Sequence, residues 1–290
     1  MQSQVRNLAI GFSGVGDMTK EVPAHYGSGG NLAEKIAEGL RNAGKDLNDL
    51  KAIDLSAVDE FHFRGRKATL QLAEEMKLSD DASVLDIGSG LGGPARTLAE
   101  EYGCNVIGLD LTRAFCEVAG ILSDWVNLAE WTEFQQGDAT NLPFAENQFD
   151  AAMTFHVAMN IPAKDKMYQQ ARRVVKPGGI FAIYDVLQGE GGEILFPVPW
   201  ARNSSISHLA TPDEMKMLLF DAGFNILDVH DSTRESLSWL EARTTHMAQS
   251  GPSPVITQIL FGGDFPEMIS NQIRNLTERK IRTVSYICET

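Results

Sequence analysis

The sequence predicts an α/β fold with a doubly wound, mostly parallel sheet of seven strands, an antiparallel last strand and helical cap segments. From about residue 80, short apolar runs alternate with helical patterns, which is typical of parallel strands covered by helices on both faces. Residues 84–93 (VLDIGSGLGG) join a strand to a helix through a glycine-rich turn. The last apolar run, residues 283–288, follows a long helical stretch, and this favours an antiparallel strand inserted into the sheet.

The helices and strands are expected in a regular order along the chain. The first thirty residues are rich in glycine and weakly patterned, and we expect them to form a loop. Leu32, Ile36 and Leu40 recur at helical spacing and predict a helix over residues 31–43, and a second helix is expected over residues 65–76. Strands are expected at residues 83–87, 105–110, 132–136, 149–155, 180–185, 224–229 and 283–288. Further helices are expected at residues 94–102, 115–122, 164–175 and 212–222, and over most of 230–282.

We expect residues 1–290 to form one catalytic domain, because a chain of this length with 43% hydrophobic residues can bury a full core. The parts of this domain are expected to be a core at residues 80–229 and 283–290, an N-terminal cap segment at 1–79, and two insertions at 186–211 and 230–282. The cap and the insertions are expected to roof a site on the substrate side.

The charge of the chain argues against a polyanionic partner. Its net charge is -14 and its pI is about 4.8, whereas nucleic-acid binding depends on the neutralisation of phosphates. The three cysteines are scattered, which suits a reducing cytoplasm and matches no zinc spacing. Residues 1–16 lack the pattern of a signal peptide, and no apolar run approaches the ~20 residues that span a bilayer. We therefore expect a cytoplasmic protein without nucleic-acid or membrane partners, and the oligomeric state stays open.

The glycine-rich turn predicts a nucleotide-type cofactor site, because backbone N–H groups at a helix N-terminus are exposed there. The turn contains G-x-G-x-x-G, and Asp110 lies about 20 residues further on, as in dinucleotide-binding folds. However, Asp86 precedes Gly88 by two residues, where its charge would repel a diphosphate and attract an ammonium group. The turn also begins only after about eighty residues, later than in many dehydrogenases. These details favour S-adenosylmethionine over NAD.

Polar residues at strand ends extend this predicted site, since ligands of such sheets bind beyond the carboxyl ends of the strands. Asp110 would accept hydrogen bonds from the ribose hydroxyls, and Asp138 would accept one from the adenine amino group. Each of these carboxylates has a plainer explanation as a helix cap or turn residue. The candidate cofactor-binding residues are Asp86, Gly88, Ser89, Gly90, Asp110, Leu111, Asp138, Ala139 and His156.

Several motifs together resemble class I S-adenosylmethionine-dependent methyltransferases. They are residues 84–93, 108–110, 137–144, 149–150 and 175–179, and the resemblance extends over roughly residues 60–230. It implies a Rossmann-like methyltransferase fold, cofactor contacts at Gly88 and Gly90, and S-adenosylhomocysteine as the product.

A narrower resemblance is to N-methyltransferases of sarcosine, dimethylglycine or phosphoethanolamine. It rests on residues 61–65 with 68–69, on 156–161 and on 197–201. It implies a small amine as the methyl acceptor, such as sarcosine or dimethylglycine. Two departures stand out. Arg64-Gly65 replaces a pair of glycines, and Asn160 replaces the catalytic histidine of the phosphoethanolamine branch. An amide cannot take a proton, so that mechanism does not transfer.

Methyl transfer is an in-line displacement that mainly requires alignment, without a metal. His156 and Tyr26 are the candidate catalytic residues, the first as a base and the second as an aromatic ring near the sulfonium. The candidate substrate-binding residues are Phe63, Arg64, Trp200 and Arg202, of which the arginines would bind a carboxylate. Aromatic residues are more often core and arginines more often solvated, so these plainer roles stay open.

Three other functions remain open from the sequence. Oxygen, sulfur and carbon acceptors are methylated on the same kind of sheet, so the fold does not settle the acceptor atom. An NAD-dependent oxidoreductase and a non-catalytic cofactor-binding module are the alternatives of a different class.

Overall fold

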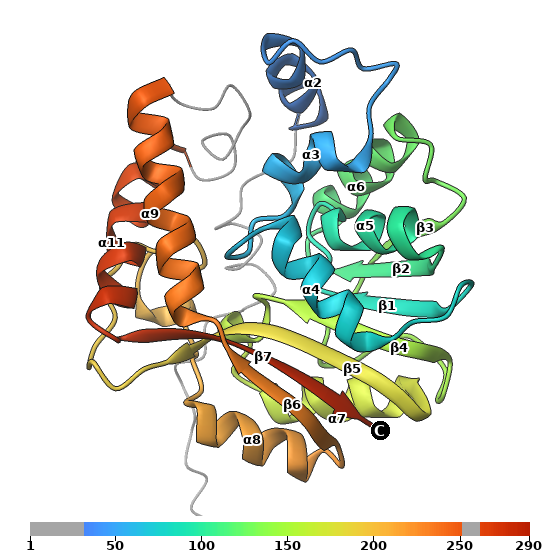
Figure 1. Ribbon diagram of the computed structural model, residues 1–290. Helices are drawn as coiled ribbons and strands as arrows, with labels where there is room; N and C mark the ends of the chain where they lie inside the picture. Colours follow the sequence, from blue (N-terminus) through green and yellow to red (C-terminus); the bar gives the residue numbers. More distant parts are fainter. Residues whose placement is uncertain (1–31, 251–261) are drawn as a thin grey trace, which may run out of the picture.

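The structure of the protein is a computed structural model that describes residues 32–250 and 262–290 (Figure 1). Its centre is one seven-stranded sheet with the order β3-β2-β1-β4-β5-β7-β6. The strands are β1 (Ser83–Ile87), β2 (Asn105–Asp110), β3 (Thr132–Gln136), β4 (Phe149–Phe155), β5 (Val175–Gln188), β6 (Asn225–Asp231) and β7 (Ile281–Glu289). Strands β1 to β5 pair in parallel, and β7 pairs antiparallel with both β5 and β6. The predicted fold class is therefore confirmed.

Helices cover both faces of this sheet. They are α2 (Leu32–Asn42), α3 (Ala52–Asp59), α4 (Arg66–Met76), α5 (Gly93–Tyr102), α6 (Arg113–Trp125), α7 (Lys164–Val174), α8 (Pro212–Asp221), α9 (Thr233–Ser250) and α11 (Phe265–Thr277), with short 3-10 helices η1 (Ala158–Asn160), η2 (Ser204–Ile206) and η3 (Gly262–Asp264). Helices α4, α5, α9 and α11 share one apolar cluster with the sheet, and α7 and α8 share another. In β1, Val84 joins the first cluster and Leu85 the second, as the alternation of side chains along a strand requires.

Two elements differ from the expectation. Helix α3 has no counterpart among the predicted helices, because its buried residues Ala52, Leu55 and Val58 are too few to show a clear period. Strand β5 begins at Val175, so that the Pro-Gly-Gly run expected to precede the strand lies within it. A register shift in the pairing of β4 with β5 accommodates this run.

The helices of the expected cap and insertions occupy different places, since α4 packs on a face of the sheet. Figure 1 shows α2 and α3 above the β1–β2 side of the sheet, and α9 packed beside α11 on the β5–β7 side. None of the helices in the two described ranges has the length and apolar composition needed to cross a bilayer.

Candidate functional site

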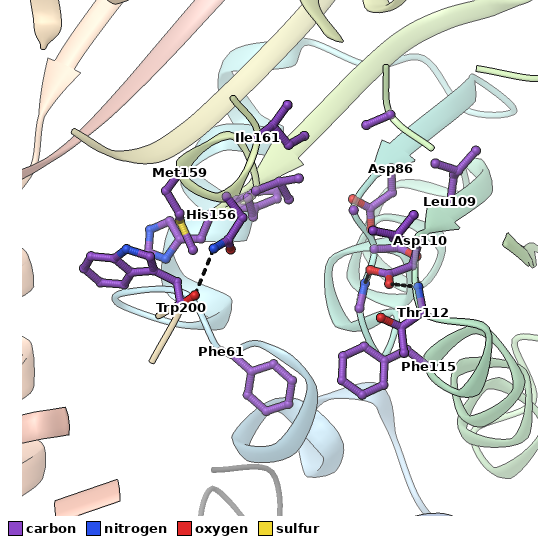
Figure 2. Close-up of a pocket in the computed structure, with 18 of the residues that line it drawn as sticks. Phe61, Asp86, Leu109, Asp110, Thr112, Phe115, His156, Met159, Ile161 and Trp200 are labelled. Atoms are coloured by element: carbon purple, nitrogen blue, oxygen red, sulfur yellow. Dashed lines mark hydrogen bonds between the residues drawn. The ribbon is translucent and has the colours of Figure 1, made fainter. Parts of the chain in front are cut away.

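A cavity of about 340 Å³ lies at the carboxyl ends of β1, β2 and β4 (Figure 2). The nine candidate cofactor-binding residues all line this cavity, although they are spread from residue 86 to residue 156. Trp200 lines it as well. A volume of this size is typical of a site for small molecules.

Gly88 and Gly90 of the glycine turn have φ angles of 79° and 53°. Both angles lie in the left-handed region, which favours glycine. The N–H of Gly88 donates to the carbonyl of Leu109 at 2.7 Å, which joins the turn to β2. A Cβ on Gly88 would lie 2.3 Å from a methyl carbon of Val157, so the chain itself requires glycine there. A Cβ on Gly90 would meet no protein atom within 4 Å. The space beside Gly90 is therefore open for a ligand.

The carboxylate of Asp110 is held by the backbone on both sides. Its Oδ2 accepts from the N–H of Gly90 at 2.9 Å, and its Oδ1 accepts from the N–H of Thr112 at 2.8 Å (Figure 2). Burial raises the pKa of Asp110, and these two hydrogen bonds oppose that shift. The end of β2 and the glycine turn are thus joined through one side chain.

Four buried polar atoms on the cavity wall have no hydrogen-bond partner within the described part of the chain. They are Oδ1 of Asp59, Oδ2 of Asp86, Oγ of Ser89 and Nε2 of His156. An unpartnered buried polar group costs about 1–3 kcal/mol, so several of them on one cavity indicate a site that binds a polar ligand. Carboxylate oxygens and a hydroxyl fit the ammonium and hydroxyl groups of S-adenosylmethionine.

Burial and neighbouring charges shift the titration of two of these groups. Burial, then the charges of Asp110 and Glu60, raises the pKa of Asp86 to about 8. Burial also raises the pKa of Asp59 to about 6, against the opposing effect of Arg96. A bound cation beside these carboxyl groups would favour their ionised forms.

Asp59 on α3 reaches the glycine turn through the buried guanidinium of Arg96. Nη2 of Arg96 donates to Oδ2 of Asp59 at 2.6 Å and also to the carbonyl of Leu91 within the turn. Nη1 of Arg96 donates to the carbonyl of Ala119 on α6 at 2.9 Å. The sequence analysis missed Asp59, because only the tertiary packing of α3 on α5 brings it to the site.

Asp138 lies in a turn directly after β3. Its Oδ1 accepts from the N–H and the hydroxyl of Thr140, both at 2.8 Å, and the turn closes through a bridge to Asn141. Asp138 is therefore a turn residue, as the plainer explanation expected, and it also lines the cavity beside Ala139.

His156 follows β4 in a left-handed backbone conformation, with a φ of 53°. Its ring packs against Tyr184, Phe63 and His62 at centroid distances of 5.0, 5.4 and 5.9 Å. Burial, then the neighbouring His62, lowers the pKa of His156 well below its usual value. The imidazole is thus neutral near pH 7.

His62 is a second cavity-lining histidine that the sequence analysis did not single out, although it lies within the 61–65 motif. Its Nε2 is 3.0 Å from the carbonyl of Gly65 and 3.2 Å from the hydroxyl of Thr69. Burial lowers the pKa of His62 to about 4. Both histidines of the cavity are therefore neutral.

A set of hydrogen bonds holds Trp200 at the cavity. Nδ2 of Asn160 donates to the carbonyl of Trp200 at 2.9 Å (Figure 2) and to that of Ile206 at 2.7 Å. The indole N–H donates to Ser207 at 3.0 Å, and Nδ2 of Asn271 donates to the carbonyl of Pro197 at 3.0 Å. Asn160 is thus a structural link between η1 and the segment that carries Trp200.

The other candidate substrate-binding residues lie elsewhere. Phe63 is packed in the core against the ring of His156, and it is 3% exposed. Arg64 donates to Oε1 of Gln71 at 2.5 Å, and Arg202 pairs with Asp264 on the surface. None of these three lines the cavity. Tyr26 lies outside the described residues.

Comparisons with known proteins show that the chain is similar to methyltransferases. A family profile described as a methyltransferase domain matches residues 85–183. Methyltransferase GfsG of Streptomyces halstedii is 30% identical over 63% of this chain and 67% of its own length. Sterol 24-C-methyltransferase ERG6B of Gibberella zeae is 37% identical over 40% of this chain. The latter match spans only 30% of the sterol enzyme, so it concerns a part of that protein.

Solved structures show the same fold at low sequence identity. Phosphoethanolamine N-methyltransferase 2 of Haemonchus contortus, in complex with S-adenosylmethionine, matches with a TM-score of 0.69 and 20% identity over 80% of this chain and 54% of that chain. A candidate sarcosine dimethylglycine methyltransferase of Galdieria sulphuraria matches with a TM-score of 0.64 and 18% identity over 89% of this chain and 98% of that chain. The chain belongs to the S-adenosylmethionine-dependent methyltransferases.

Proposed function

We propose that this chain transfers a methyl group from S-adenosylmethionine to a small molecule. The observation that carries the proposal is that unpartnered buried polar atoms line one cavity, at Asp59, Asp86 and Ser89 and, on the wall opposite Asp86, at His156 (Figure 2). Oδ1 of Asp59 lies only 2.7 Å from the position that a Cβ on Gly93 would take, so it borders the glycine turn. This arrangement suits the cationic amino-acid end of the cofactor.

In this proposal, different residues of the cavity bind different parts of the cofactor. Asp59 and Asp86 accept hydrogen bonds from its ammonium group, and Asp110 accepts from its ribose hydroxyls. Asp138 and the backbone of Ala139 bind the adenine, with Leu111 against the ring. The open space at Gly90 lets the cofactor approach the backbone.

The bound cofactor supplies a methyl group on a sulfonium, and an acceptor with a free electron pair attacks it in line. The chain aligns the acceptor, and alignment of this kind is equivalent to effective molarities of up to about 10⁵–10⁸ M. His156 and His62 are neutral and line the cavity, and their lowered pKa values make them weak bases, so we assign them hydrogen bonding to the acceptor rather than removal of its proton. Buried Trp200 and Met159 keep water out of this part of the site.

The acceptor predicted from the sequence is an amine such as sarcosine or dimethylglycine, and both compounds are included in the assay panel. Arg64 and Arg202 were expected to bind the carboxylate of these amino acids, but Arg64 donates a hydrogen bond to Gln71 and Arg202 forms an ion pair with Asp264. Hydroxyl, thiol and carbon acceptors are therefore tested alongside amines.

Calorimetry with S-adenosylmethionine, S-adenosylhomocysteine and NAD tests the cofactor. We expect both adenosyl ligands to bind and NAD not to bind, and tight NAD binding without response to the adenosyl ligands would overturn the proposal. A metabolite panel with isotope-labelled methyl donor then tests transfer. Cofactor binding without labelling of any acceptor would favour a non-catalytic binding module.

A further inference from the structure

One side of the cavity, which comprises Phe61, His62, Phe155, Met159, Ile161 and Trp200, is mostly apolar; we call it the acceptor side. Figure 2 shows Met159, Ile161 and Trp200 on one wall and Asp86 and Asp110 on the opposite wall. Trp200 and Met159 are only 2% and 4% exposed, so their positions are fixed by packing. Apolar contact contributes roughly 25 cal/mol per Å² of buried surface, which favours a ligand with an apolar body.

The charged side chains that line the cavity, within residues 32–250 and 262–290, are the carboxyl groups of Asp59, Asp86, Asp110 and Asp138. Burial, followed by the charges of Asp110 and Glu60, raises the pKa of Asp86, so this part of the cavity does not favour additional negative charge. The described residues that line the cavity include no lysine or arginine, so a carboxylate or phosphate on the acceptor has no cationic partner among them.

The polar groups that remain for an acceptor are uncharged. His62 and His156 are neutral, and the amide of Gln272 on α11 also lines the cavity. Such groups form hydrogen bonds to a hydroxyl or an uncharged amine without an ion pair. They complement a polar group that is itself neutral.

We infer that the acceptor site binds a neutral, largely apolar small molecule whose polar group, a hydroxyl or an uncharged amine, hydrogen-bonds to His62, His156 or Gln272. Molecules that carry a carboxylate or a phosphate are poor ligands of this site. The inference rests on the proposed function, because it concerns the second ligand of the same cavity.

Matched pairs of probes test this inference by calorimetry on the full chain saturated with S-adenosylhomocysteine. The pairs are benzyl alcohol with benzoate, and N-methylaniline with its para-carboxylate. We expect the neutral member of each pair to bind at least about tenfold more tightly than the anion. Equal or tighter binding of the anions, or no binding of either neutral probe at about 10 mM, would overturn the inference. A failure of S-adenosylhomocysteine itself to bind would instead contradict the proposed function.

A charge placed in the apolar wall provides the second test. Ile161→Arg adds a cation on the acceptor side, and we expect it to shift the neutral-to-anion preference by about tenfold toward the anion. Ile121→Arg, at a residue of α6 that is 39% exposed and does not line the cavity, is the matched control and leaves the preference unchanged. Unchanged affinity for S-adenosylhomocysteine in both variants shows that the fold is intact. An unchanged preference in Ile161→Arg would count against a neutral acceptor at this wall.

Discussion

The two sides of the cavity are built in different ways. The cofactor side, which comprises Asp86, Ser89, Gly90 and Asp110, is held mainly by backbone hydrogen bonds between the glycine turn and β2. The acceptor side is formed by the loop between α3 and α4, by the end of β4 with the η1 region, and by the segment that carries Trp200. These segments are distant from one another in the sequence. Local chemistry therefore defines the cofactor side, whereas tertiary packing defines the acceptor side. Substitutions on one side should leave the ligand of the other largely unaffected.

The largest effect is expected from Asp110→Ala. The change removes the acceptor for two backbone N–H groups and, in the proposed function, for the ribose hydroxyls, and hydrogen bonds to a charged group contribute roughly 1.5–3 kcal/mol each. We expect the affinity for S-adenosylhomocysteine, measured by calorimetry, to fall by about 1000-fold. Asp124→Ala, at an exposed position of α6, is the control. A loss of less than about tenfold would mean that the cofactor side does not depend on this carboxylate.

A smaller loss is expected from Gly90→Ala. The added Cβ meets no protein atom within 4 Å, so it would contact only a bound ligand. We expect the affinity for S-adenosylhomocysteine to fall by about 100-fold, with acceptor-probe binding to the cofactor-free protein unchanged. Gly44→Ala is matched in having a positive φ and open space, and it controls for backbone strain. Equal affinity in the two variants would show that the cofactor does not approach the turn.

Asn160→Asp tests the acceptor side. The aspartate keeps the shape but loses the donors to the carbonyls of Trp200 and Ile206, so Trp200 should no longer be held at the cavity. We expect the KM of the acceptor found in the panel to rise about tenfold, while the affinity for S-adenosylhomocysteine changes less than about twofold. Asn203→Asp is the control, because its side chain accepts from the N–H of Ser205 and an aspartate can do the same. A lost cofactor affinity in Asn160→Asp would show that the two sides are coupled.

The smallest effect is a pH dependence of cofactor affinity. With a pKa of about 8, Asp86 is mostly protonated at pH 7 in the free protein, and a bound ammonium group favours its ionised form. Binding below pH 8 therefore releases a proton, and the affinity for S-adenosylhomocysteine should rise with pH and level off above pH 8. We expect a rise of up to about tenfold between pH 6 and 8 in calorimetry, with a smaller rise in Asp86→Asn. Equal slopes in the two proteins would assign the titration to another group.

The sequence sufficed to select residues that lie together on the cofactor side, because these residues belong to short strand–turn segments. The nine candidate residues lie on one cavity once the strands pair in parallel, as strand ends of such a sheet must. Their individual roles remain predictions. The fold class followed from the same alternation of strands and helices.

The acceptor side was harder to predict, since its members meet only after the chain has folded. Arg64 and Arg202 lie next to cavity-lining residues in the sequence. However, the guanidinium of Arg64 is hydrogen-bonded to Gln71, and that of Arg202 is paired with Asp264. His62 and Asn160 lie within the motifs at residues 61–65 and 156–161. However, His62 contacts Thr69 of α4, and Asn160 contacts the segment near Trp200. No local pattern could show these pairings.

The position of β7 has a consequence for synthesis of the protein on the ribosome. Among the strands that the structure describes, β6 pairs with β7 alone, and β7 also covers the edge of β5. Until residues 281–289 have left the exit tunnel, β5 ends the growing sheet and β6 has no strand beside it. The edge of β5 therefore stays open through the translation of residues 189–280, and such edges invite aggregation. Chaperone binding to the nascent chain should be most needed in that interval.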